Sequence, residues 1–312
     1  MKNNKKKFPF RLLWIVLTLI CITFLTRVYF WITDDIRIAN MVYELPYYKE
    51  WEIPPLTPNE KEQLDAVLSQ KFYYIGKGTQ SYAFSSEDDQ YVIKFFKFKH
   101  LRPNWFIDNL PPISPFVEYR GKQTARKQKK LYRAFAGYHL AYEVHREDSG
   151  LLFIHLNKTH DLHKTVTLVD KIGLEHHADL DKMVFFIQKK VQTTRQRIDE
   201  SMKKGDLVLA KNDIRKIFDL YLSEYQKGIY DLDHGVMHNT GFADEKPIHL
   251  DVGMLTKKES MRETQQAQND LALIVRKFRI WFNANYPEAA SEMMQDIDSK
   301  MKEIFESPQD KN

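Results

Sequence analysis

Cysteine is almost missing from this chain. The one cysteine among 312 residues, Cys21, lies in an apolar run near the N-terminus. The rest of the chain therefore has no disulfide, which mildly disfavours a protein of the eukaryotic secretory pathway. Zinc is not indicated either, because His160, His163, His176 and His177 match no zinc-binding spacing and no cysteine accompanies them.

Excess positive charge is missing from the body of the chain. The formal net charge is +5, and five basic residues near the N-terminus supply it: Lys2, Lys5, Lys6, Lys7 and Arg11. Without them, the 47 basic residues fall to the same number as the 42 acidic ones. A nucleic-acid-binding domain carries its basic surface on the folded body. We therefore expect no nucleic-acid partner.

A long apolar run follows the basic N-terminal tail, residues 1–11. Residues 12–32 are apolar apart from Arg27 and a few hydroxyl groups, and about 20 residues are enough for a helix to cross a bilayer. The aromatic residues 29–31 suit the membrane interface. A cleaved signal peptide is the alternative, but the run is long for one and no small-residue cleavage site follows it. We therefore expect a single transmembrane helix over residues 12–32.

The charge distribution also predicts an orientation in the membrane. Basic residues on one flank of a transmembrane helix favour the cytoplasmic side, so the N-terminus is expected in the cytoplasm and the body on the other side. That orientation conflicts with any activity that uses ATP, because ATP is concentrated in the cytoplasm. The face that the body occupies is therefore left open.

The pattern of apolar residues predicts an α+β fold, β-rich first and α-rich later. Residues 33–69 are polar and proline-bearing, which is typical of a stalk or linker. The predicted strands are 72–75, 82–84, 91–96, 165–172 and 183–188. The predicted helices are a short one at 60–69, capped by Asn59, and longer ones at 122–146, 211–227 and 262–285, and the proline-rich residues 101–117 form a loop.

Two features of the β-rich part suggest phosphate binding. Gly76 and Gly78 lie between two predicted strands, where glycines let the backbone bend over a phosphate and turn N–H groups toward it. Hairpin turns also contain glycine for conformational reasons alone. Lys94 lies inside the apolar strand 91–96, and a buried ammonium must be paired. It either faces solvent or reaches under the glycine-rich loop to the phosphates of ATP.

The segment with the most chemistry is GIYDLDHGVMHNTGFADEKPIHLDVG, residues 228–253. It presents Asp233, Asn239 and Asp251 in that order. In phosphoryl transfer from ATP, one aspartate orients the attacking hydroxyl, while an asparagine and a second aspartate hold Mg²⁺. The alternative is a tight turn rich in capping Asp, His and Asn side chains.

The order of these features resembles the protein-kinase-like superfamily, over roughly residues 70–285. The resemblance implies a two-lobed α+β fold behind the membrane helix. The N-lobe, residues 70–190, would hold a small antiparallel sheet and one long helix. The C-lobe, residues 191–306, would be mostly helical and reduced in size, with a tail at 307–312.

The resemblance also implies the site and its cofactors, ATP and Mg²⁺. Gly76, Gly78 and Lys94 would hold the phosphates of ATP. The metal would bind Asn239 and Asp251. Asp233 would be the catalytic residue that orients an acceptor hydroxyl.

Several positions depart from the family pattern. The Asp233–Asn239 spacing is six residues instead of five, so Asp231 is an alternative catalytic residue. The family pairs its lysine with a glutamate on the long helix, and here the middle of that helix has no acid. Glu143, near the helix end, is the favoured partner of Lys94, ahead of Glu118. Without such a pair the site would be degenerate.

These observations predict a membrane-anchored kinase-like protein that transfers a phosphoryl group from ATP–Mg to a hydroxyl acceptor. The acceptor, whether protein, sugar or small molecule, is not specified by the sequence. The alternative function is a catalytically inactive kinase-like binding or scaffold protein at the membrane. A third possibility is a membrane protein of unrelated α+β fold.

Overall fold

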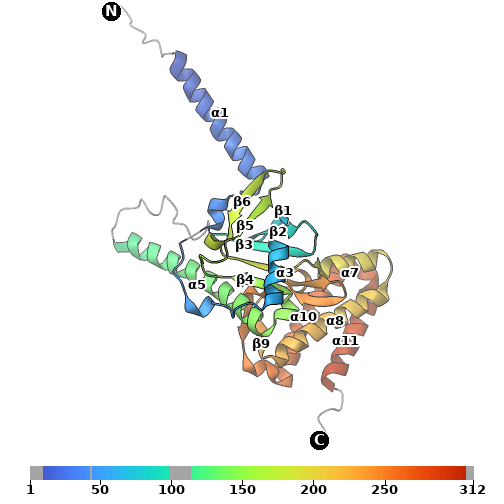
Figure 1. The fold of residues 1–312 in the computed structure, drawn as a ribbon. Coiled ribbons are helices and arrows are strands. Elements are labelled where there is room, and N and C mark those ends of the chain that lie inside the picture. Colours follow the sequence, from blue (N-terminus) through green and yellow to red (C-terminus); the bar gives the residue numbers. More distant parts are fainter. Residues whose placement is uncertain (1–9, 43, 99–113, 307–312) are drawn as a thin grey trace, which may run out of the picture.

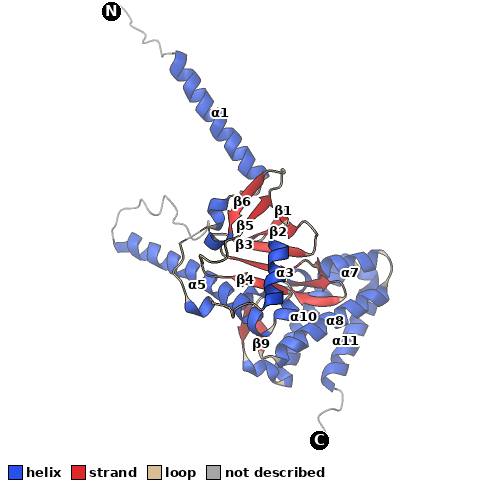
Figure 2. Ribbon diagram, in the orientation of Figure 1, coloured by secondary structure: helices blue, strands red, loops and turns tan. Residues whose placement is uncertain are grey.

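The computed structural model describes residues 10–42, 44–98 and 114–306 (Figure 1). Most of the basic tail 1–11, the tail 307–312 and most of the predicted loop 101–117 lie outside the described residues. One long helix, α1 (Phe10–Ile32), projects from a body of mixed helix and strand (Figures 1 and 2).

Helix α1 has the properties predicted for the apolar run. Its segment Leu12–Ile32 is 21 residues long, with a mean hydropathy of 2.1, and none of it is buried in the protein. The helix closes in a turn in which Asp34 and Asp35 adopt left-handed backbone angles, with φ of 57° and 62°. The N–H of Asp35 donates to the carbonyl of Phe30 at 2.7 Å. By length and composition this helix can cross a membrane, and a signal sequence would pass the same test.

A seven-stranded sheet forms the first part of the body within the described residues (Figure 2). Its strand order is β4-β7-β3-β2-β1-β5-β6. The strands are β1 (Lys71–Lys77), β2 (Ser81–Ser86), β3 (Tyr91–Phe96), β4 (Leu151–His155), β5 (Thr165–Val169), β6 (Glu175–Asp179) and β7 (Phe185–Lys189).

This sheet is larger than the small antiparallel sheet predicted. Strands β4 and β6 extend it at the two edges, and neither was predicted from the sequence. Strand β6 has the polar sequence Glu-His-His-Ala-Asp, and most of its side chains are not buried, so it lacks the apolar pattern from which a strand is predicted. The sheet is also mixed, since β1 and β5 run parallel with Phe72 opposite Leu168.

Residues 33–69, predicted as a stalk or linker with a short helix at 60–69, fold onto the body, and the predicted short helix corresponds to α3, which Thr57 caps in place of Asn59. They contain helix α2 (Ile38–Met41), the 3-10 turn η1 (Lys49–Trp51) and helix α3 (Pro58–Leu68). Leu64 and Leu68 of α3 are buried against the sheet in one core with Phe72. Local sequence explains why α3 forms and packs on the sheet. Thr57 and Glu60 form a capping box that starts the helix, and its apolar residues recur at helical spacing.

Helix α5 (Ser114–Val144) lies against the sheet and corresponds to the predicted helix 122–146. Phe135 and Tyr138 share a buried core with Phe96 of β3 and Phe186 of β7. The ring centroids of Tyr138 and Phe186 are 4.0 Å apart. This packing fixes the rotation of α5 about its axis, and with it the residues that the helix presents to β3.

The second part of the body is mainly helical. Its main helices are α7 (Thr194–Lys203), α8 (Leu207–Gln226), α10 (Thr264–Asn285) and α11 (Pro287–Glu306). A three-stranded sheet contains β8 (Gln192–Thr193), β10 (Thr240–Ala243) and β11 (Lys246–His249). A two-stranded sheet contains β9 (Ile229–Asp231) and β12 (Leu255–Lys257). Ile214, Phe218 and Phe278 are fully buried in its core. The predicted α+β order and the helices predicted at 211–227 and 262–285 are confirmed.

Candidate active site

A cleft of about 550 Å³ lies between the sheet and the segment that precedes α10. Among its lining residues are Lys94, Asp233, Asn239 and Asp251. These polar residues, predicted from the sequence as one site, come from positions as far apart as 94 and 251. The fold therefore brings them together on opposite walls of a single cleft.

A β-hairpin joins Asn239 to Asp251. Asn239 directly precedes β10, Asp251 follows β11 by two residues, and Thr240 pairs with His249 across the ladder. The carbonyl of Asn239 accepts the N–H of Leu250 at 2.6 Å and that of Asp251 at 3.4 Å. The hairpin thus places the two proposed metal ligands side by side although twelve positions separate them.

The six-residue spacing from Asp233 to Asn239 does not separate the two side chains. The Nδ2 of Asn239 donates to Oδ2 of Asp233 at 3.1 Å. The additional residue is taken up in a turn, where His234 has a φ of 51°. The carboxylate of Asp231 holds this turn by accepting the N–H groups of Asp233 and His234, at 2.9 and 3.0 Å.

Asp231, the alternative catalytic residue, occupies a structural position. It is only 2% exposed and is not among the residues that line the cleft. Burial raises its pKa, against the opposing charge of His249. Asp233, in contrast, lines the cleft and is exposed to it. The structure therefore favours Asp233 over Asp231 as the group that meets an acceptor.

Gly235 makes room for the side chain of Asn239. A Cβ atom at position 235 would lie 2.5 Å from Nδ2 of Asn239, well inside van der Waals contact. Helix α9 (Val236–Asn239) begins directly after this glycine and carries Asn239 in its last position. The glycine is thus a requirement of the site that the sequence did not reveal.

The oxygen atoms on this wall fit a hard divalent cation. Since Nδ2 of Asn239 is committed to Asp233, the Oδ1 of its amide is the atom left for a cation. The carboxylate of Asp251 is exposed to the cleft, and its Oδ1 lies 3.4 Å from the hydroxyl of Tyr138. Carboxylate and amide oxygens are the ligands that Mg²⁺ prefers. Asn239 and Asp251 are therefore suited to hold it.

Lys94 lines the opposite wall of the cleft. In the sheet it pairs with Ala83 of β2 and Phe186 of β7. Its Nζ donates to Oε1 of Gln188 at 3.2 Å and lies 5.3 Å from the centroid of the Phe186 ring. Burial lowers the pKa of Lys94, and the charge of Asp251 opposes that effect. Of the two positions considered for Lys94, the structure places it in the cleft.

Neither glutamate considered for Lys94 contacts it. Glu143 is half exposed and lies 3.5 Å from His139, one turn earlier in the helix. Glu118 pairs with Lys122 on the exposed start of α5. Tyr138 faces the cleft instead, and five residues further along a helix turn the side chain by about 140°. The expected pairing of Lys94 with Glu143 is therefore absent.

Gln188 is the neighbour of Lys94 that sequence reasoning missed. Its side chain is fully buried, and its Nε2 donates to the carbonyls of Ser149 at 2.6 Å and His249 at 3.3 Å. Gln188 thus connects Lys94 on β3 to β11, the strand that leads into Asp251. Its signal was a lone amide at the end of the apolar strand 183–188.

The two glycines of the predicted phosphate loop have different positions. Gly78 lines the cleft together with Thr79 and Ser81, but its own N–H donates to the carbonyl of Ser81 at 2.9 Å. Gly76 lies in β1, at an irregularity in its pairing with β2, and is not among the residues that line the cleft. The hairpin loop therefore covers the cleft, while Gly76 shapes the strand before it.

Helix α5 approaches the Asp251 segment closely through Gly137. A Cβ atom at this position would lie 2.4 Å from the carbonyl oxygen of Val252 and 2.8 Å from the carbonyl carbon of Gly253. Both are backbone atoms, which cannot move aside without moving Asp251. A glycine in the middle of a helix lowers helix stability, and this close contact is the structural reason for it.

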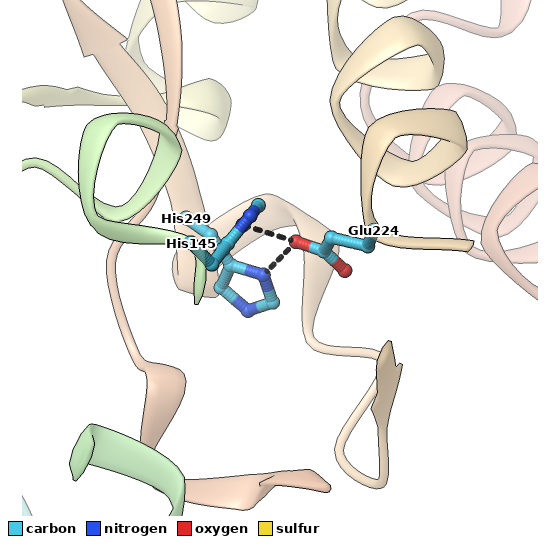
Figure 3. Close-up of side chains that lie close together, drawn as sticks. All are labelled: His145, Glu224 and His249. Carbon is cyan, nitrogen blue, oxygen red and sulfur yellow. Dashed lines mark hydrogen bonds and ion pairs between the residues drawn. The ribbon is translucent and has the colours of Figure 1, made fainter. Parts of the chain in front are cut away.

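A buried cluster of His145, Glu224 and His249 lies behind the cleft (Figure 3). The Oε1 atom of Glu224 lies 3.1 Å from Nε2 of His145 and 2.6 Å from Nδ1 of His249. Figure 3 shows Glu224 reaching from α8 toward both rings. Burial would raise the pKa of Glu224, but the two histidines lower it to about 2.

These are donor types that a transition metal accepts, but hydrogen bonds to Oε1 of Glu224 already hold both rings, although Oε2 of Glu224 and Nε2 of His249 are buried without a hydrogen-bond partner. The ammonium of Lys227 lies 3.0 Å from Nδ1 of His145 and 2.8 Å from Oδ2 of Asp148. A lysine charge directly beside the cluster disfavours an added cation. The cluster is best described as a buried ionic contact between the end of α5, helix α8 and strand β11. This cluster was not predicted from the sequence.

Comparison with known proteins finds only distant similarity. No protein-family model and no curated protein matches the sequence. Among solved structures, the chain is similar to WbdD bound to the kinase inhibitor LY294002, with 11% identity and a TM-score of 0.35, over 73% of this chain and 45% of that one. The structure titled as the bifunctional kinase-methyltransferase WbdD gives 11% identity and a TM-score of 0.33, over 75% and 45%.

A third similar structure is the ternary complex of streptomycin, ATP and APH(2")-IIa. Here the identity is 12% and the TM-score 0.28, over 81% of this chain and 93% of that chain. The chain is thus distantly similar in structure to these proteins and spans less than half of the WbdD chains. At TM-scores below 0.5, the similarities do not carry a functional assignment.

Proposed function

We propose that the cleft binds ATP with Mg²⁺ and transfers a phosphoryl group to a hydroxyl acceptor. The observation that supports this best is the convergence of Lys94, Asp233, Asn239 and Asp251 on one cleft. A cleft of this volume is within the range of small-molecule sites. A cation, two metal ligands and a free carboxylate are the groups that phosphoryl transfer requires.

Each residue has a role that follows from its contacts. The ammonium of Lys94 stabilises negative charge on the phosphates. The Oδ1 of Asn239 and the carboxylate of Asp251 hold Mg²⁺, which neutralises phosphate charge when it is bound. Asp233 accepts the hydrogen bond of the acceptor hydroxyl and takes its proton as the new O–P bond forms, while the bond between the γ-phosphorus and its bridging oxygen breaks and ADP leaves with that oxygen. The amide of Asn239 orients Asp233 for this step.

The second candidate function is a kinase-like binding or scaffold protein without catalysis. One observation favours it: Lys94 contacts the neutral Gln188, and the helix position facing the cleft is Tyr138 instead of a glutamate. Lysine without a carboxylate partner on α5 is held less firmly toward the phosphates. This function requires nucleotide or partner binding and no turnover.

Calorimetric titration of the full chain with Mg–ATP tests the proposal. Asp251→Asn removes a metal ligand and is expected to abolish the Mg-dependent part of ATP binding. Asp244→Asn is the matched control, because Asp244 is exposed at the far end of the same hairpin and asparagine tolerates its φ of 54°. Absence of Mg-dependent ATP binding in the unaltered protein would rule out the kinase activity and would leave only a scaffold protein that binds a partner without nucleotide.

We also propose that α1 anchors the protein in a membrane as a single-pass helix. Its support is the apolar segment Leu12–Ile32, in which the most apolar 18-residue window has no buried residue and only the last turns contact the body. The basic N-terminus favours the cytoplasmic side, which would place the body on the other side, whereas the proposed kinase activity needs the body in the cytoplasm, so the face of the body is the point to be tested. Protease treatment of intact cells distinguishes the two faces: digestion of the body from outside would place it away from cytoplasmic ATP and contradict the kinase activity.

A further inference from the structure

The tip of the β5–β6 hairpin exposes apolar side chains where polar turn residues are usual. The turn reads Asp170-Lys171-Ile172-Gly173-Leu174. Ile172 and Leu174 are each 50% exposed, although both are branched aliphatic residues. Turns at protein surfaces favour Gly, Asn, Asp, Ser and Pro, so two exposed aliphatic side chains around one glycine need a reason.

The tip is held rigidly in this exposed conformation. One oxygen of the Asp170 carboxylate, Oδ1, accepts the N–H groups of Ile172 and Leu174, both at 3.0 Å. Gly173 has a φ of 87°, and its N–H donates to the carbonyl of Asp170 at 3.0 Å. The backbone therefore cannot turn Ile172 and Leu174 inward without breaking these bonds.

The tip lies directly beside the end of helix α1 (Figure 1). The hydroxyl of Tyr29, in the last turns of α1, donates to Oδ2 of Asp170 at 3.1 Å. On the other side of the turn, Nζ of Lys171 lies 3.4 Å from the carboxylate of Asp34, which follows α1. Two contacts thus join the hairpin tip to the point where the apolar helix meets the body.

Other exposed apolar residues belong to the same end of the sheet. Strand β1 runs parallel to β5 with Tyr73 opposite Val169, so the residues that follow in both strands lie at the same end of the sheet. Ile75 is 50% exposed there, and Trp31 near the end of α1 is 81% exposed. Lys77, two residues after Ile75, pairs with Asp34 at 2.8 Å.

We propose that this surface, formed by the Ile172–Leu174 tip with Ile75 and Trp31, lies in the lipid headgroup region of the bilayer that α1 crosses. The inference rests on the proposed membrane anchor. Rigid apolar side chains beside an apolar helix, with lysines at their edge, match the boundary between acyl chains and headgroups. The tip gives the body a second contact with the membrane besides the helix.

The two contacts fix how the cleft is oriented toward the bilayer. Strand β1 pairs with β5 on one side and with β2 on the other, and the loop between β1 and β2 covers the cleft. A single helix would let the body rotate about one connection. With the tip held in the lipid surface, the hydrogen-bonded sheet keeps the cleft at a constant height and tilt.

A single-cysteine labelling experiment tests this contact. Cys21→Ser removes the one native cysteine, and Ile172→Cys then carries an environment-sensitive NBD fluorophore. The matched control is Val208→Cys, which is 69% exposed at the start of α8. Both proteins are reconstituted as full chains in phosphatidylcholine–phosphatidylglycerol vesicles that contain nitroxide-labelled lipid.

We expect the label at 172 to shift to shorter wavelength and to lose most of its fluorescence to the nitroxide lipid. The label at 208 should keep its intensity. Equal, weak quenching by nitroxide lipid at both positions would overturn the proposal. Aqueous iodide serves as a second quencher: if neither nitroxide lipid nor iodide quenches the label at 172, a second protein copy covers the tip and the proposal is also overturned.

Vesicle flotation on the same samples separates this inference from the proposed anchor. If the protein does not float with vesicles, the anchor fails and the tip contact fails with it. If the protein floats and position 172 is not quenched, the anchor stands and the tip contact is wrong. Thermal unfolding of each labelled variant confirms that the sheet is intact.

Discussion

The two walls of the cleft differ in how closely they follow the kinase-like pattern. The wall formed by Asp233, Asn239 and Asp251 keeps its side chains, and local hydrogen bonds hold them together despite the altered spacing. The sheet wall keeps Lys94 but gives it Gln188 as a neighbour in place of a glutamate. The wall proposed to bind the metal (the metal-binding wall) thus has the residues predicted for it, while the wall proposed to bind phosphate (the phosphate-binding wall) departs from the predicted pattern at the partner of Lys94.

This difference indicates that the metal-binding wall is more sensitive to single substitutions than the phosphate-binding wall. The metal-binding wall depends on residues close in sequence, so one turn and one hairpin define it. The phosphate-binding wall depends on contacts between β3, α5 and β7, which are distant in sequence and can be replaced one at a time. Four predictions test the comparison, from the largest expected effect to the smallest.

The largest effect is expected for Asp233→Asn on the metal-binding wall. The change removes the group that accepts the hydroxyl proton, and loss of a general base lowers turnover by about 10²–10⁴-fold. Mg–ATP affinity should change little, since Asp233 is not a proposed metal ligand. Steady-state kinetics and calorimetry measure the two quantities. Equal loss of binding and turnover would show that Asp233 acts on the metal instead.

Gly137→Ala tests how the walls are joined. The new methyl would collide with the backbone of Val252 and Gly253, and overpacking of this kind costs about 1–3 kcal/mol of stability. Mg–ATP affinity should fall as well, because Asp251 must move. Chemical denaturation and calorimetry measure both.

Gly121→Ala is the matched control for this change. Gly121 lies in the same helix with no atom within 4 Å of its would-be Cβ. Alanine there should stabilise the protein by about 0.5–1 kcal/mol, as in other exposed helix positions. If both variants behave alike, the close approach at Gly137 does not matter.

Gln188→Leu tests the phosphate-binding wall, in which Gln188 contacts Lys94. It leaves the buried carbonyls of Ser149 and His249 without this donor, which costs about 1–3 kcal/mol of stability. Because Lys94 also loses its acceptor, the Michaelis constant for ATP should rise more than turnover falls. Gln188→Glu, which supplies a carboxylate, should restore part of the ATP affinity. An unchanged Michaelis constant in both variants would contradict the role given to Gln188.

The smallest effect is expected at Asp148 in α6 (Arg146–Ser149), which is not among the residues that line the cleft. Burial would raise the pKa of Asp148, but Lys227, Ser223 and His145 lower it from 3.8 to about 2. A carboxyl with a lowered folded pKa stabilises the protein above its unfolded pKa. This stabilisation is lost as pH falls from about 4 to about 2.

Asp148→Asn should therefore cost roughly 1–2 kcal/mol at pH 6, after discounting for partial exposure, and almost nothing near pH 2. Urea denaturation at several pH values measures the difference. Glu147→Gln is the control, because Glu147 is 92% exposed and should change stability little at any pH. A pH-independent cost at Asp148 would mean that packing, not charge, is lost.

The sequence predicted the parts of this molecule that depend on local pattern. Hydrophobic spacing gave α1, α8 and α10, and residue order gave Asn239 and Asp251 as neighbours. Contacts between residues far apart in the sequence could not be predicted. The parallel pairing of β1 with β5 leaves no local trace, and β6 is too polar to read as a strand.

The candidate site divides in the same way. Lys94 was recognised as an unusual residue, but its contact with Gln188 depends on the register of β3 against β7. The sequence favours Glu143, an acid near the end of the helix, as the partner of Lys94, but packing of Phe135 and Tyr138 turns Glu143 away from the cleft. Side-chain direction on a helix is decided by its tertiary contacts, which one sequence does not contain.

The β10–β11 hairpin has a consequence for how nucleotide would enter and leave the proposed site. It carries Asn239 and Asp251 at its two ends, so the separation of these two proposed ligands would not change if the sheet moved relative to the helices. Lys94, on the sheet, would move away with it. Opening the cleft would then loosen the hold on the phosphates while the metal ligands stay in register, ready for the next nucleotide.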